Sequence, residues 1–186
     1  MSSRDLGTYY KVDARTLKLV EEIDPPGVVW AAVLTTDGWR LTVGKGLNDD
    51  RYVYRYTPGA GFVKLFACPD FAGSYLSFDG SYLYLSQWYK GDVHRVDDSG
   101  KISRTINVSA EICGHTFVDG SLYVLRGTEQ DGESWTIARL DPRDETPVVN
   151  DLGSVPFACR SLAFDGEKFW TNHRAAGEVV SFNLPK

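Results

Sequence analysis

The sequence predicts an all-β fold, a four-bladed antiparallel β-propeller. A strand that ends in Asp-Gly recurs four times, at a spacing of roughly 39 to 47 residues, which matches the period of a four-stranded propeller blade. Apolar residues nowhere keep a 3.6-residue period over three turns without an intervening Gly or Pro, which excludes a helical repeat. An aromatic content of 13% and 18 glycines fit short strands joined by tight turns.

The clearest copy of the repeat lies between residues 75 and 108. Its first strand ends at Asp79-Gly80, a tight-turn dipeptide between two apolar runs and the strongest short signal for a β-hairpin. A second strand returns, a third follows a polar loop, and a fourth completes an antiparallel meander. We expect these strands at 75–78, 82–86, 93–97 and 103–108.

The other copies follow the same order along the chain. The first strand with its turn is expected at 33–38, 115–120 and 161–166, and the second strand at 40–43, 122–125 and 168–172. Third strands are expected at 52–57, 135–141 and 177–183, and fourth strands at 62–66 and 148–152. A third-type strand and a fourth strand also occur at the N-terminus, at 7–13 and 17–23. Residues 1–186 therefore form a single domain with blades at about 31–67, 73–109, 113–153 and 159–184 plus 8–23.

The count of strands decides the expected topology. The C-terminal blade has three strands, so the N-terminal segment is expected to supply its fourth strand and to leave no open edge. One third-type strand is then in surplus. It lies outside as a fifth strand, displaces the strand at 179–182, or pairs with another subunit in a homodimer. A five-bladed arrangement would leave one blade without inner strands and is not favoured.

The strand-turn-strand element resembles the blades of a known group of propellers. The run from Phe78 to Tyr84, FDGSYLY, and its counterpart from Phe164 to Trp170 are similar to blades of the NHL, YVTN and virginiamycin-B-lyase-like propellers. All four copies share the element, so the resemblance spans nearly the whole chain. It implies the fold; these propellers include lyases, hydrolases, cyclotransferases and binding modules, and no catalytic motif of theirs carries over to named positions.

Composition excludes several classes of function. The formal charge is −5 and no basic stripe is present, which argues against nucleic acid as a partner. No apolar run is long enough for a membrane span, and the N-terminal residues lack the apolar core of a signal peptide, so a cytoplasmic protein is the expectation. Three cysteines exclude a fully paired disulfide framework, and no motif identifies a cofactor.

The loops that lead into the first strands, and those between second and third strands, meet on one face of a propeller. Cys113 and Cys159 precede first strands there, and His115 follows Cys113 by two residues. Packing of buried thiols is favoured over a soft-metal site, because no C-x-x-C pair exists, and no metal ligand is predicted. A catalytic Cys113 activated by His115 or His173 is a further hypothesis.

Aromatic and charged residues at the same mouth are candidates for ligand binding. Exposed rings could stack on a planar ligand, a sugar or a peptide, and arginines with His173 could hold a carboxylate or phosphate. The residues are Trp30, Tyr75, Trp88, Tyr89, Arg126, Cys159, Arg160 and Arg174. The loop 127–134 is a candidate lid or cation site.

His115 occupies the place that leucine takes in the other blades, at Leu34, Leu76 and Leu162. One interpretation is a neutral histidine bonded to a backbone carbonyl; the other places it towards the channel as a base or an anchor. The sequence thus predicts binding of a small molecule or peptide at the mouth, with acid/base chemistry of lyase, cyclase or isomerase type as an extension. The alternative is a protein-interaction propeller without enzymatic activity.

Overall fold

The computed structural model describes residues 2–3, 7–13, 15–45, 50–129 and 133–183 of this chain. These residues form antiparallel strands and one short 3-10 turn, η1 (Pro69–Phe71), and no α-helix occurs among them. The charged residue Asp131, in the predicted lid loop, and Leu184, at the predicted end of the last blade, lie outside the described residues.

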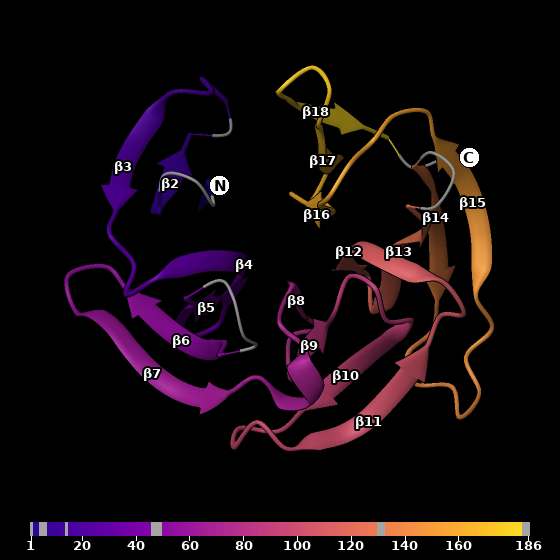
Figure 1. Ribbon diagram of the computed structural model, residues 1–186, viewed down its shortest axis with the longest axis horizontal. Helices are drawn as coiled ribbons and strands as arrows, with labels where there is room; N and C mark the ends of the chain where they lie inside the picture. Colours follow the sequence, from indigo (N-terminus) through magenta and orange to yellow (C-terminus); the bar gives the residue numbers. More distant parts are fainter. Residues whose placement is uncertain (1, 4–6, 14, 46–49, 130–132, 184–186) are drawn as a thin grey trace.

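Four sheets follow one another around a common centre (Figure 1). The sheets contain β4–β7, β8–β11, β12–β15 and β16–β18, and in each the strands pair in the order of the chain. This arrangement confirms the all-β, four-bladed antiparallel propeller.

The strand bounds of the four blades are as follows. The first blade has β4 (Val28–Thr35), β5 (Gly38–Gly44), β6 (Tyr52–Thr57) and β7 (Gly61–Ala67), and the second has β8 (Tyr75–Phe78), β9 (Leu83–Ser86), β10 (Asp92–Val96) and β11 (Ile102–Asn107). The third has β12 (Glu111–Val118), β13 (Ser121–Thr128), β14 (Ser134–Leu140) and β15 (Asn150–Val155), and the last has β16 (Ala163–Phe164), β17 (Phe169–His173) and β18 (Glu178–Phe182).

Two first strands begin earlier than the sequence predicts. The strands β4 and β12 each continue about four residues upstream through a β-bulge, at Trp30 and at Cys113, where the register with the second strand shifts by one residue. A bulge redirects the side chain of the extra residue. The sequence motif gave the turn but contained no signal for these extensions.

The N-terminal strands do not complete the last blade as predicted. The strands β1 (Ser2–Ser3), β2 (Thr8–Val12) and β3 (Leu19–Ile23) form a sheet of their own, and within the described residues none of them pairs with β16, β17 or β18. In Figure 1 this indigo sheet lies between the first blade and the last. The structure therefore contains a separate three-stranded sheet in addition to the four blades.

Apolar burial explains this difference. Tyr9 of β2 and Ile23 of β3 are buried in one cluster with Leu41, Val43 and Tyr56 of the first blade. The hairpin thus gains its buried surface by packing its face on the neighbouring sheet, and pairing with the edge of β18 is not needed for that burial. The surplus-strand homodimer stays a prediction.

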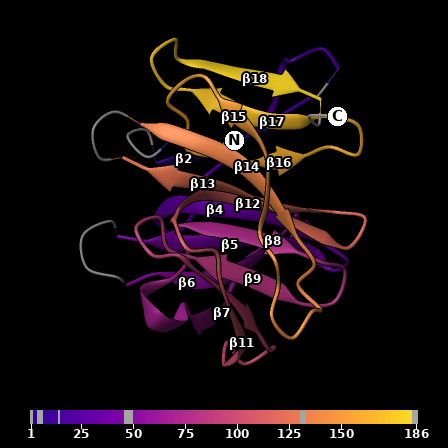
Figure 2. The ribbon, with the colours of Figure 1, turned by 90° about the vertical axis from the view of Figure 1, so that its right-hand side faces the viewer.

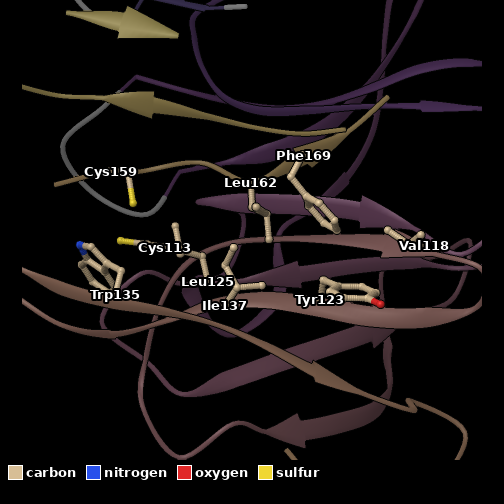
Figure 3. Packing of buried hydrophobic residues seen from close by; sticks show 9 residues of the cluster. All are labelled: Cys113, Val118, Tyr123, Leu125, Trp135, Ile137, Cys159, Leu162 and Phe169. Carbon is tan, nitrogen blue, oxygen red and sulfur yellow. The ribbon is translucent and has the colours of Figure 1, made fainter. Parts of the chain in front are cut away.

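The core consists of the layers between successive sheets. One apolar cluster joins the first and second blades, a second joins the second and third, and a third joins the third to the last. Figure 3 shows the third of these, with Cys113 and Cys159 beside the Trp135 ring at one end and Tyr123 and Phe169 at the other. Figure 2 shows β18, the outer strand of the last blade, at one end of the molecule.

Gly114 permits a close approach between the backbones of the third and last blades. Its φ of +153° lies in a region that L side chains rarely adopt, and an added Cβ would lie 2.5 Å from the backbone nitrogen of Leu162. Only glycine allows β12 to pass so close to the chain that leads into β16.

We predict that Gly114→Ala lowers the free energy of unfolding by about 2 kcal/mol more than Gly80→Ala does. Both glycines have a positive φ, but a Cβ at Gly80 would meet nothing within 4 Å, so the comparison isolates the steric clash between blades. Urea denaturation of both variants measures the difference. Equal losses would contradict the close approach.

Candidate functional site

A cavity of about 500 Å³ lies where the first strands of the four blades meet. Each blade contributes one residue of the same layer to its wall: Ala32, Leu76, His115 and Leu162. Leu76 lies opposite Leu85 and His115 opposite Val124, so the two occupy equivalent positions in their sheets. The cavity extends towards the N-terminal sheet and the last blade, where Tyr9 and Val179 line it.

In the first blade, the predicted equivalence of Leu34 with Leu76 is wrong. Leu34 pairs with Trp39 near the hairpin turn and is 59% exposed, whereas Ala32, opposite Leu41, lines the cavity. The Asp-Gly turn of this blade is shorter than that of the second blade, so alignment on the turn displaces the strand by two residues. The prediction that His115 takes the place of a leucine holds for Leu76 and Leu162.

His115 is the polar member of this layer, and it is 2% exposed. Its Nδ1 lies 2.6 Å from the hydroxyl oxygen of Ser77, on the first strand of the second blade. Its Nε2 is buried and has no hydrogen-bond partner among the described residues. Burial lowers the pKa of His115 from 6.5 to about 3, so the ring is neutral at physiological pH.

Three of the predicted ligand-binding residues line the cavity: Trp30, Tyr75 and Arg160. Trp30 is the bulged residue of β4, and the guanidinium of Arg51 stacks on its ring at 4.8 Å. Tyr75 is largely buried, which raises its pKa, and its hydroxyl interacts with the Cys113 thiol and with Arg160. The structure thus brings these residues together with His115 around one space.

Arg160 is the centre of an ion-pair cluster at the mouth of the cavity. Its guanidinium pairs with Glu129 and lies 3.6 Å from Glu133, while Arg174 pairs with Glu133 and lies 3.9 Å from Glu129. The Arg160 guanidinium also stacks on the Trp88 ring at 4.7 Å. We call these five residues the mouth cluster; it connects loops of the second, third and last blades.

The two cysteines of the predicted site do not line the cavity. Cys113 and Cys159 are fully buried in the apolar cluster of Trp135. Burial raises the pKa of Cys113 to about 12 and that of Cys159 to about 11, so both are neutral thiols. This is the environment of packing thiols, and it does not favour a thiolate nucleophile.

The remaining predicted residues lie apart from the cavity. Arg126 forms a bidentate pair with Asp151, at 2.9 and 3.0 Å, and donates to the carbonyl of Val108. The ring of His173 stacks on Phe157 at 4.4 Å. Tyr89 is 48% exposed and packs edge-on against Trp88.

Sequence reasoning missed three residues that organise the site. Ser77 orients the His115 ring, Asn172 accepts the backbone N–H of Arg160 at 2.6 Å, and Glu133 joins the mouth cluster. Ser77 and Asn172 have neighbours in space that belong to other strands, so no local motif contains them. Glu133 lies in the loop 127–134, the predicted lid or cation site, but the sequence of a loop alone does not indicate the partners of its charges.

Some further properties limit what the site contains. Among the described residues, no group of three or more His, Cys, Asp or Glu side chains is arranged to hold a metal ion. In the same part of the chain, no helix is long and apolar enough to cross a membrane.

Comparison with known proteins identifies the fold. No family model and no curated protein matches the sequence. The structure is similar to glutaminyl cyclase from Myxococcus xanthus, with a TM-score of 0.57 and 15% identity over 82% of this chain and 64% of that one. It is also similar to a catalytically inactive virginiamycin B lyase from Staphylococcus aureus, solved with quinupristin, with a TM-score of 0.58 and 13% identity over 97% of this chain and 64% of that one.

A third similar structure is a chain of the mitotic checkpoint complex, with a TM-score of 0.61 and 12% identity over 100% of this chain and 60% of that one. The likeness establishes the propeller fold. The chain spans 60–64% of the length of these proteins, and the identities are too low to transfer an activity. The neighbours include enzymes of the cyclase and lyase classes, as the sequence resemblance implied.

We predict that the neutral His115 makes folding sensitive to acid. The unfolded chain takes up a proton at this ring below about pH 6.5, whereas the folded protein does so only near pH 3, so stability falls as the pH falls through this interval. Compared with His115→Leu, the wild type should lose about 2 kcal/mol of unfolding free energy between pH 7 and pH 5.

Urea denaturation of both proteins at the two pH values measures this difference. The carboxylates titrate in both proteins and therefore cancel in the comparison. An unchanged difference between pH 7 and pH 5 would show that His115 is not held neutral.

Proposed function

We propose that this protein binds a small molecule or the side chain of a peptide in the axial cavity. The observation that carries the proposal is the buried Nε2 of His115, which has no hydrogen-bond partner among the described residues and belongs to a residue that lines the cavity. A buried polar atom without a partner costs free energy. A ligand group that hydrogen-bonds to it would recover that cost.

The cavity has the other properties of a ligand site. Its volume of about 500 Å³ lies within the usual range for small-molecule pockets. Aromatic side chains, among them Trp30, Trp39 and Trp170, supply apolar wall, and a few polar groups converge on it. Most of its polar residues belong to strands or adjoin them, which positions them rigidly.

The chemistry favours binding over acid/base catalysis. A general base works best when its pKa lies near the working pH, and burial holds that of His115 at about 3. The neighbouring thiols are protonated at neutral pH. Within this proposal His115 is therefore an anchor, and the lyase, cyclase or isomerase chemistry would require a bound ligand to raise its pKa.

A second candidate function, a protein-interaction surface, is supported by one observation on the outer face of the mouth. Phe71 and Tyr89 are 54% and 48% exposed, and their chain neighbours Asp70 and Lys90 form an ion pair at 3.1 Å. Exposed aromatic residues are typical of interaction surfaces. This surface does not include the residues of the cavity layer.

We predict that a fragment library screened by ligand-detected NMR yields hits whose binding His115→Leu abolishes, because leucine removes the hydrogen-bonding nitrogen and retains the side-chain bulk. His173→Leu is the matched control, since it changes a histidine that does not line the cavity, and it should leave the hits unchanged. Hits that survive His115→Leu, or no hits at all, would overturn the proposed function. If Phe71→Ala abolishes binding of the hits and His115→Leu does not, the interaction surface is favoured.

A further inference from the structure

We infer that the axial cavity selects an uncharged ligand that carries a carbonyl oxygen, and that the Nε–H of Arg160 donates a hydrogen bond to this oxygen. The inference rests on the proposed function and specifies the class of ligand. It depends on how the nitrogens of Arg160 are used and on the charges around the cavity.

Arg160 has a buried donor, its Nε–H, without a partner in the described part of the chain. Its Nη2 pairs with Glu129 and Glu133, and its backbone N–H donates to Asn172. Its Nε is buried and has no hydrogen-bond partner among the described residues, and the residue lines the same cavity as His115. A guanidinium is always protonated and has no acceptor, so the group that fits this nitrogen must be an acceptor.

The charges of the mouth cluster around this donor cancel. Two carboxylates, Glu129 and Glu133, face two guanidinium groups, Arg160 and Arg174, so the cluster has no net charge. A third carboxylate, Glu111, accepts the backbone N–H of Glu129 at 3.0 Å. An anionic ligand at Arg160 would therefore meet repulsion from carboxylates whose counter-charge is already shared.

A cationic ligand finds no carboxylate to pair with in the described wall of the cavity. No Asp or Glu is among the described residues that line the cavity, and His115 is neutral. Burial of an unpaired charge against aromatic and aliphatic walls is costly. Uncharged polar groups avoid this cost.

An amide can satisfy both Arg160 Nε and His115 Nε2. Its carbonyl oxygen accepts from the Nε–H of Arg160, and a second polar group can hydrogen-bond to His115 Nε2, whose role is set by the tautomer that Ser77 stabilises. The apolar part of the ligand packs on the aromatic walls, such as Trp30 and Tyr75. The ligand class is thus a carbonyl compound with an apolar body and no charge.

The test uses three probes of one carbon skeleton: 3-phenylpropanamide, which is neutral, 3-phenylpropanoate and 3-phenylpropylammonium. Dissociation constants at pH 7 are measured by NMR titration of the full chain. The amide should bind at least about tenfold more tightly than either ion. An acid that binds as tightly as the amide, or more tightly, overturns the inference.

Arg160→Lys tests the donor itself. Lysine keeps the positive charge beside Glu129 and Glu133 but has no Nε–H in that position, so amide affinity should fall about tenfold. Arg126→Lys is the matched control, because it makes the same replacement in a pair with Asp151 outside the cavity, and the affinity should not change. Unchanged amide binding in folded Arg160→Lys contradicts the inference.

A measurement on the wild type covers the case in which Arg160→Lys does not fold. The ¹H–¹⁵N resonance of the Arg160 Nε–H should shift when the amide is added, and a resonance that does not move overturns the inference. If the whole series fails while library fragments bind in a His115-dependent way, the ligand class is wrong and the proposed function stands. If no fragment binds either, the proposed function itself is wrong.

Discussion

Face-to-face packing of apolar residues between neighbouring sheets holds this molecule together, because no strand of one sheet pairs with a strand of another among the described residues. Each core cluster lies between two consecutive sheets and takes side chains from both. The N-terminal hairpin follows the same rule when it buries Tyr9 and Ile23 against the first blade. Backbone pairing stabilises each sheet internally, and burial of apolar surface sets the order of the sheets around the axis.

This mode of assembly also creates the cavity. Sheets that pack around an axis bring their first strands together, and the residues of one layer then face a shared space. Three members of that layer are apolar, and His115 is the exception. Because its Nδ1 is bonded to Ser77 of the adjacent blade, the orientation of the ring depends on the packing of the second blade against the third.

The mouth cluster adds a polar connection where the apolar layers end. Arg160 contacts Trp88 of the second blade and two carboxylates of the third, so one side chain of the last blade links three blades. The four charged residues of the mouth cluster are partly exposed, with side-chain exposures of 15–44%. Ion pairs with this degree of exposure contribute little to stability. Their larger effect is on the charge that a ligand meets at the cavity.

The sequence by itself determined the fold class, the four Asp-Gly hairpins and the position of nearly every second and third strand, because hydrophobic alternation and turn chemistry are local. It also indicated His115 as an exception in the repeat, together with Trp30, Tyr75 and Arg160. Only the tertiary structure decided that the N-terminal strands form a separate sheet, that Ser77 orients His115, and that Arg126 and His173 lie elsewhere. These outcomes depend on which faces pack together across distant parts of the chain, and local patterns contain no information about that choice.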